Sequence, residues 1–229
     1  MRPPSIIVSY DGTSNDRDAL ALGRLLTGAG ASLALAYVRH ARAAGTGRER
    51  LAAREAEALL AAGADVLGRP DIPQHVVVSA STPVGLRDLA LNCGADLIVF
   101  GSEYRTASGH VDPQASARRL LDGGPVALAI APAGFAERDG YAVVTIAAIG
   151  EDGDPCPHET AEAIASGLGG AVVGPSAGEA DLVVVGSKPG TVNGRVTISA
   201  AAEYVIELSR CPVVVLPRGV ALEFDADGG

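Results

Sequence analysis

Two short motifs in the sequence contain the residue types of nucleophilic catalysis. Residues 174–178 have the G-x-S-x-G spacing of a nucleophile elbow, which places a serine on a strained turn between a strand and a helix. This segment runs directly into the apolar stretch 181–185, and no histidine follows His158, so a serine hydrolase with this chain order has no base. Cys156 lies beside His158, but such close neighbours on a turn seldom reach one substrate atom, and no third group that would orient the base is evident. We therefore predict no catalytic residues.

The residue types that bind metals or form redox pairs are scattered. The histidines lack the spacing of metal ligands; they are His40, His75, His110 and His158. The cysteines are odd in number and form no C-x-x-C pair; they are Cys93, Cys156 and Cys211. We expect reduced structural thiols, as in a cytosolic protein, and no metal site.

Length and composition place the chain among globular proteins. Its 229 residues are 48% hydrophobic and 20% charged, which suits one or two packed domains. The formal net charge is −9, and a negative field repels nucleic acid and anionic lipid headgroups. No window reaches the ~18 uninterrupted apolar residues of a membrane span. We therefore expect a cytoplasmic protein with neither nucleic acid nor a membrane as its partner.

An internal repeat in the sequence implies two copies of one structural unit. Residues 95–102 reappear as residues 180–187, at an offset of 85, and both copies end in Gly-Ser. A Pro-containing apolar run at 124–130 corresponds to 211–216, at an offset of 87. Each unit is therefore expected to end in a Pro-led strand.

The second copy is expected to be shorter than the first. The opening apolar run 6–12 corresponds best to 143–150, at an offset near 137, so the second copy lacks roughly 52 residues before its Gly-Ser run. We predict three parts of the chain: a first domain at 1–135, a shortened second domain at 139–218 and a C-terminal tail at 219–229.

Apolar runs of strand length alternate with helical patterns in the first copy, which is typical of βαβ units and a parallel sheet. The expected strands lie near 5–10, 32–38, 75–79, 96–101 and 125–131. We expect a first helix capped by Ser14 or Asn15 and a fourth with Pro113 in its first turn. Because crossovers are right-handed, these units form a doubly wound, Rossmann-like open α/β sheet with ligands at the carboxyl ends of its strands.

The sequence resembles the universal stress proteins, specifically a tandem member with a shortened, degenerate second repeat. The resemblance covers nearly the whole chain and depends on the order and spacing of three stretches: 7–14 (IVSYDGTS), 94–102 (GADLIVFGS) and 210–217 (RCPVVVLP). It implies that the two units pair through their last strands, here 125–131 with 212–217, as a pseudo-dimer within one chain. Whether two chains associate further as a homodimer stays open.

Many members of that family bind ATP, so the resemblance implies ATP or AMP as the ligand. Matched residue by residue, Asp11 corresponds to the acid that holds the nucleoside, and Val38 lies beside the base. Glycines allow backbone N–H groups to close on phosphate oxygens, and the helix that follows offers its positive N-terminus. The remaining candidate nucleotide-binding residues are Gly101, Ser102 and Ser116 in the first copy and Gly186 and Ser187 in the second.

Both phosphate loops depart from the family pattern. Tyr104 occupies the second glycine position of the first copy, and Gln114-Ala115 replace its later Gly-Ser pair. In the second copy Pro189 and Ser199-Ala200 fill the motif positions. Each copy thus contains part of a nucleotide site and neither contains a whole one. The alternative is that both loops are ordinary connections between a strand and a helix, in which glycine serves the backbone conformation alone.

The resemblance implies a non-catalytic, regulatory binding module of the stress response with degenerate ATP or AMP binding. Two alternatives stay open. One is a module that binds a protein partner, still unknown, and no nucleotide; the other is a slow ATPase.

Overall fold

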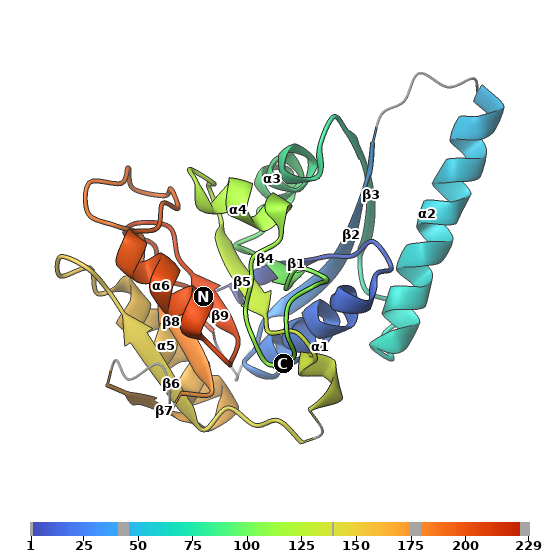
Figure 1. Ribbon diagram of the computed structural model, residues 1–229. Coiled ribbons are helices and arrows are strands. Elements are labelled where there is room, and N and C mark those ends of the chain that lie inside the picture. The colour runs from blue at the N-terminus through green and yellow to red at the C-terminus, as the bar shows by residue number, and fades with distance from the viewer. Residues whose placement is uncertain (1, 41–45, 139, 175–179, 225–229) are drawn as a thin grey trace.

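The computed structural model describes residues 2–40, 46–138, 140–174 and 180–224. In this part of the chain nine strands form one sheet, in the order β3-β2-β1-β4-β5-β9-β8-β6-β7 (Figure 1). The first half of the sheet contains β1 (Ser5–Ser9), β2 (Ser32–His40), β3 (Gln74–Ser79), β4 (Leu97–Gly101) and β5 (Ala127–Ala131). The second half contains β6 (Thr145–Ile149), β7 (Ala171–Val173), β8 (Leu182–Val185) and β9 (Val213–Val215).

Helices cover both faces of this sheet, as the alternating sequence pattern predicts. One face packs against α1 (Ser14–Gly28), α2 (Thr46–Val66), α5 (Cys156–Leu168) and the short helix η1 (Phe135–Glu137). The other face packs against α3 (Thr82–Cys93), α4 (Ala115–Leu121) and α6 (Ala200–Leu208). Every residue of β4 and β5 is buried, because these central strands are covered on both sides. The doubly wound α/β fold expected from the sequence is confirmed.

The two halves of the sheet meet at one antiparallel strand pair. Ala129 of β5 lies opposite Val214 of β9, whereas the other neighbouring strands of the described sheet run parallel. The predicted pairing of 125–131 with 212–217 within one chain is confirmed. Because β9 runs against β5, the carboxyl ends of the strands in one half lie at the same edge of the sheet as the amino ends in the other half.

The strand register corrects the offset of the final strands. Ile98 lies opposite Leu128 in the first half, and Val183 lies opposite Val213 in the second. The final strands are therefore offset by 85 residues, like the Gly-Ser strands, and the offset of 87 is wrong. The prolines that precede the two strands lie at different distances from these paired residues, which explains the error.

The first strands are also offset differently from the prediction. Ile6 lies opposite Leu97, and Ile146 lies opposite Leu182, so their offset is 140 and not 137. The second half is therefore shorter by 55 residues, the difference between 140 and 85. β7 pairs with β6 as β2 pairs with β1, and only residues 174–181 separate β7 from β8. The missing segment thus corresponds to α2, β3 and α3.

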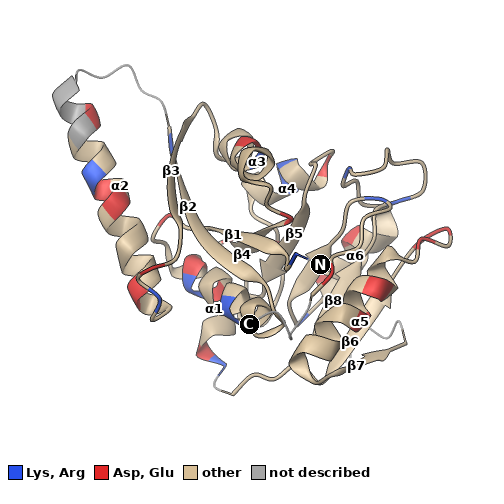
Figure 2. Cartoon of the chain, turned by 180° about the vertical axis from the view of Figure 1, so that it is seen from behind, with Lys and Arg blue, Asp and Glu red and all other residues tan. Residues whose placement is uncertain are grey.

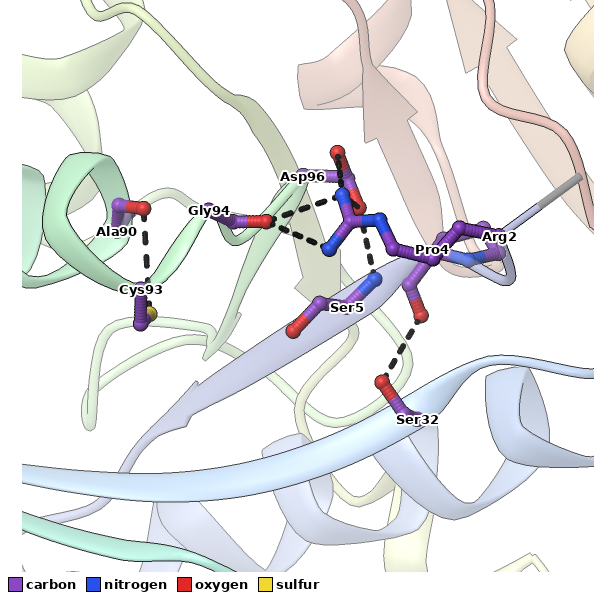
Figure 3. A network of polar contacts seen from close by, with 8 residues as sticks. All are labelled: Arg2, Pro4, Ser5, Ser32, Ala90, Cys93, Gly94 and Asp96. Carbon is purple, nitrogen blue, oxygen red and sulfur yellow. Dashed lines mark hydrogen bonds and ion pairs between the residues drawn. The ribbon is translucent and has the colours of Figure 1, made fainter.

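The amino ends of β1 and β4 are held together by polar contacts around Asp96 (Figure 3). The Arg2 guanidinium donates to both Asp96 carboxylate oxygens, at 3.0 and 3.1 Å, and the Ser5 N–H donates to one of them at 2.8 Å. In the second half the Asp181 carboxylate accepts the Thr145 N–H in the same way, at 2.8 Å. These contacts lie at the amino edge of their strands, away from the edge where ligands are expected.

Two helix starts differ from the prediction. The N-cap of α1 is Thr13, just before the two predicted capping residues. α4 begins after Pro113, and Gln114 occupies its N-cap position without a capping hydrogen bond from the side chain. Pro113 instead forms an antiparallel bridge with Ser102, so the loop after β4 folds back on itself before the helix starts.

Candidate functional site

A cavity of about 300 Å³ lies at the carboxyl ends of β1 and β2, where a doubly wound sheet places its ligands. Three of the predicted site residues line it, and they come from separate segments of the chain. Asp11 follows β1, Val38 lies in β2, and Ser116 lies in the first turn of α4. The other lining residues are Ser9, Tyr10, Thr13, Asp16, Tyr37, His40, Thr82 and Gln114.

Asp11 and Val38 give this cavity a polar and an apolar wall. Asp11 is exposed on a turn in which Gly12 has a φ of +81°, and its carboxylate accepts the Thr13 N–H at 3.2 Å. Val38 is 7% exposed and belongs to the hydrophobic core. A carboxylate accepts hydrogen bonds from ligand hydroxyls, and an apolar wall packs against a planar ring. The two walls together suit a molecule with a polyhydroxyl part and a flat apolar part.

The sequence reasoning missed Asp16, which also lines the cavity. One of its carboxylate oxygens accepts the backbone N–H groups of Asp11, at 2.7 Å, and Thr13, at 3.0 Å. Asp16 is only 4% exposed. This burial, together with the neighbouring Asp11 carboxyl, raises the pKa of Asp16 to about 7. A local signal existed, because an acid three residues after a threonine N-cap is one half of a capping box.

Phosphate groups find few partners in this cavity. Among the described residues that line it none is lysine or arginine, and two are carboxylic acids. His40 is the imidazole in the wall, and it is exposed. The cavity therefore favours the uncharged part of a nucleotide over its phosphates.

Gly101 and Ser102 do not line the cavity. Gly101 packs against the start of α1, and the Ser102 side chain is hydrogen-bonded within the protein. A Cβ at Gly101 would lie 2.1 Å from the Asn15 carbonyl oxygen, so this glycine is what allows β4 to approach the start of α1. The buried Ser102 hydroxyl donates to the Ala131 carbonyl at 2.7 Å and accepts the Asp112 N–H at 3.2 Å. Its hydrogen-bonding capacity is used within the loop after β4.

Gly186 and Ser187 repeat this arrangement in the second half, at the opposite edge of the sheet. The buried Ser187 hydroxyl donates to the Leu216 carbonyl at 2.7 Å and accepts the Thr197 N–H at 3.2 Å. A Cβ at Gly186 would lie 2.8 Å from the Pro157 ring at the start of α5. The structure therefore does not bring the seven predicted residues together, since these two lie at the carboxyl end of β8.

Both serines are expected to stabilise the fold equally. Ser102→Ala and Ser187→Ala each leave a buried carbonyl and a partly buried N–H without the serine hydroxyl, so each variant should lose about 2 kcal/mol of unfolding free energy. Urea denaturation measures the loss. Ser116→Ala is the control, because the described residues form no hydrogen bond to that hydroxyl, and it should change stability by less than about 0.5 kcal/mol. A loss at Ser102 no larger than at Ser116 would contradict this role.

In the second half an ion pair joins the loop after β6 to the segment after β9. The Arg218 guanidinium pairs with the Asp154 carboxylate at 3.5 Å and donates to the Glu151 carbonyl at 3.0 Å. The side chains of Asp154 and Arg218 are 4% and 17% exposed. Burial alone would raise the pKa of Asp154, but hydrogen bonds from Cys156 and Gly219 and the Arg218 charge outweigh it and lower that pKa.

Glu151 occupies the position of Asp11 in the second half, because the first strands are offset by 140 residues. Its carboxylate accepts a hydrogen bond from the Ser199 hydroxyl, which also caps α6. Ser199 is in turn the counterpart of Gln114, at the offset of 85. In the first half these two positions face each other across the cavity, whereas in the second half they bond directly. Figure 2 shows the acidic loop between β6 and α5 to which Glu151 belongs.

The cysteine, histidine and metal-ligand candidates from the sequence are not assembled into a site in the described residues. Burial, with Asp154 beside it, raises the pKa of the Cys156 thiol to about 11, so this thiol stays protonated at neutral pH. His158 is exposed and lies 3.3 Å from Glu162, one helical turn away. No three His, Cys, Asp or Glu residues in the described chain are placed to hold a metal ion. Residues 175–178 of the G-x-S-x-G motif lie outside the described residues.

The described helices include none that is both long and apolar enough to span a membrane. No family model matches the sequence, and no curated protein matches it either.

Solved structures with low sequence identity match nearly the whole chain. A universal stress protein from Archaeoglobus fulgidus DSM 4304 is 15% identical, over 96% of this chain and 100% of its own, with a TM-score of 0.70. A putative universal stress protein from Pseudomonas aeruginosa UCBPP-PA14 is 14% identical, over 95% of this chain and 94% of its own, with a TM-score of 0.63. A protein of unknown function from Pseudomonas aeruginosa PAO1 is 14% identical, over 95% and 93%, with a TM-score of 0.62.

These matches agree with the doubly wound α/β sheet. At such low identity the likeness concerns the fold. The chain has the fold of the universal stress proteins.

Proposed function

We propose that the protein is a non-catalytic regulatory module that binds the nucleoside part of AMP or ATP in the cavity at the carboxyl ends of β1 and β2. The observation that supports this most is the convergence of Asp11, Val38 and Ser116 on that cavity from three separate segments. Its volume of about 300 Å³ is at the lower end of the range of small-molecule pockets, and a nucleoside fits that size better than a triphosphate does.

The phosphate end of the ligand is held weakly. Among the described residues that line the cavity there is no lysine or arginine, whereas there are two carboxylic acids. Gly101 and Ser102, which the family pattern assigns to phosphate, are engaged in packing and in the Ala131 hydrogen bond. We therefore expect adenosine and AMP to bind at least as tightly as ATP.

Each chain binds one ligand. In the second half Glu151, the counterpart of Asp11, is engaged in a hydrogen bond with Ser199. The two positions lie at opposite edges of the sheet, so they do not combine into a single larger site.

Two measurements test the binding. Freshly purified protein is denatured and the released small molecules are identified by mass spectrometry; adenosine, AMP and ATP are then titrated by calorimetry into ligand-free protein. We expect one site per chain and no preference for ATP. The proposal is contradicted if no nucleotide is released and none of the three ligands gives titration heat.

Asp11→Ala is expected to weaken adenosine binding by about 10- to 100-fold, because the ligand hydroxyls lose a charged acceptor. Calorimetry measures the change, and circular dichroism shows whether the fold is kept. Glu151→Ala is the matched control, since it removes the acid at the equivalent position of the second half. Equal affinity in the wild type and the Asp11 variant would place the ligand elsewhere. ATP turnover that Asp11→Ala abolishes would contradict a non-catalytic role.

A second candidate function is binding of a protein partner without nucleotide. Tyr204 and Leu208, one turn apart on α6, are 62% and 57% exposed and form an apolar strip. A blank result in both nucleotide measurements favours this function.

A further inference from the structure

Asp16 is a buried acid in the wall of the cavity, and its surroundings do not balance its charge. It lies in the first turn of α1, where its carboxylate accepts two backbone N–H groups, from Asp11 and Thr13. The described chain forms no ion pair with it. Two N–H donors stabilise a negative charge only in part when the residue is 4% exposed.

The Asp11 and Asp16 carboxyl groups lie close together, because one oxygen of each accepts the Thr13 N–H, at 3.2 and 3.0 Å. Two negative charges this close repel each other, which favours a proton on one of the two groups. Burial and the Asp11 neighbour raise the pKa of Asp16 to about 7, in agreement with this geometry. Asp16 therefore holds a proton in mildly acidic solution and loses it as the pH rises through about 7.

The groups that face Asp16 come from each element around the cavity. Tyr10 and Asp11 follow β1, Tyr37 and His40 come from β2, and Arg17 is the next residue on α1. α3 and α4 contribute Thr82, Gln114 and Ser116, which carry no charge. His40 is the imidazole in the cavity wall, so the test must separate its effect from that of the acid pair.

We propose that Asp16 and Asp11 share one proton and that ligand binding in this cavity requires the shared proton. This inference rests on the proposed nucleoside binding. A bound ligand displaces water from the two carboxyl groups, and a doubly charged pair without water is less stable than a singly charged one. The ligand therefore binds the protonated pair and takes up a proton when the solution is alkaline.

Adenosine is the probe, because it has no phosphate and so neither a phosphate ionisation near pH 6 nor an anion for His40 to attract. We expect its affinity for the wild-type protein to fall about tenfold between pH 6 and pH 8, as the proton leaves a pair that titrates near 7. Calorimetry at pH 8 in buffers of different ionisation enthalpy should show the uptake of about one proton per ligand.

Asp16→Asn separates the shared proton from the fold. The asparagine oxygen still accepts the N–H groups of Asp11 and Thr13, and its amide N–H takes the place of the shared proton. This variant should bind adenosine with less than about twofold change in affinity between pH 6 and 8 and should take up no proton.

Asp18→Asn is the matched control. Asp18 is another buried acid of α1 with a pKa raised by burial, but it accepts the N–H groups of Gly134 and Ala136, outside the cavity. The control should keep the wild-type pH dependence.

Carbon-13 NMR titration of the aspartate carboxyl groups in ligand-free protein separates this inference from the proposed function. Adenosine binding that is unchanged from pH 6 to 8, or an Asp16 signal that titrates near pH 4, overturns the shared proton even if adenosine binds. If no ligand binds at any pH, the proposed function and the coupling both fail, while an Asp16 signal that titrates near pH 7 still shows that the pair holds a proton.

Discussion

Gly101→Ala is expected to lower the free energy of unfolding by about 3 kcal/mol or more. The added methyl carbon would lie 2.1 Å from the Asn15 carbonyl oxygen and 2.8 Å from its carbonyl carbon, and both are backbone atoms. Because these atoms belong to the first turn of α1, the helix must move away from β4, and α1 carries part of the main core. Urea denaturation followed by circular dichroism measures the loss.

The equivalent change in the second half gives a graded comparison. Gly186→Ala brings its methyl carbon to 2.8 Å from the Pro157 ring, and the next atom is 3.7 Å away, so a small shift of one ring relieves the contact. We expect a loss of about 1 kcal/mol there. Equal losses at the two glycines would mean that the approach of Asn15 to β4 does not determine the cost.

Arg218→Ala is expected to destabilise the protein by about 2 to 3 kcal/mol, because it leaves the Asp154 carboxylate inside the protein without its cation. The Arg218 guanidinium also donates to the Glu151 carbonyl, and that hydrogen bond is lost with it. In the Arg218→Ala background, Asp154→Asn should recover part of the loss, since it removes the unpaired charge. Thermal and urea unfolding of the two single variants and the double variant measure this coupling.

The stabilisation from Asp154 should depend on pH in a defined direction. Its pKa in the folded protein lies below its usual value, so its contribution is complete above the unfolded pKa of about 4 and is lost as the pH falls through the lowered folded pKa. The wild type and Asp154→Asn should therefore differ most at neutral pH and converge in strong acid. A difference that grows as the pH falls would contradict the ion pair.

Most of the fold could be predicted because its signals are local. Apolar runs of strand length, bounded by glycine or proline, placed β1, β4 and β5 within about a residue or two of their observed positions. The predicted offsets of the first and final strands between the two halves were less accurate. They depended on aligning short apolar segments, and many alignments of Val, Ile and Ala are equally good. Register is set by backbone pairing, which a single sequence does not display.

The candidate site was predicted only in part. The resemblance to the universal stress proteins implied Asp11, Val38 and Ser116, and these residues meet because parallel strands direct their carboxyl ends to one edge. The packing role of Gly101 could not be inferred, because it depends on the distance between β4 and Asn15. The Arg218–Asp154 pair joins residues 64 positions apart, and no spacing rule links them. Gly186 and Ser187 fall at the opposite edge because β5 and β9 are antiparallel, and that orientation decides which predicted residues can act together.

The antiparallel pair of β5 and β9 also determines how the protein responds to dilution. Between two separate chains such a pairing obeys mass action and weakens as the protein concentration falls. Here the connecting chain keeps the partner strand nearby at an effective concentration on the order of millimolar or higher, whatever the protein concentration. In a symmetric homodimer a substitution changes both copies of a site at once. Because each half occurs once in this chain, the second half can hold an internal ion pair at Arg218 while the first half keeps an open cavity.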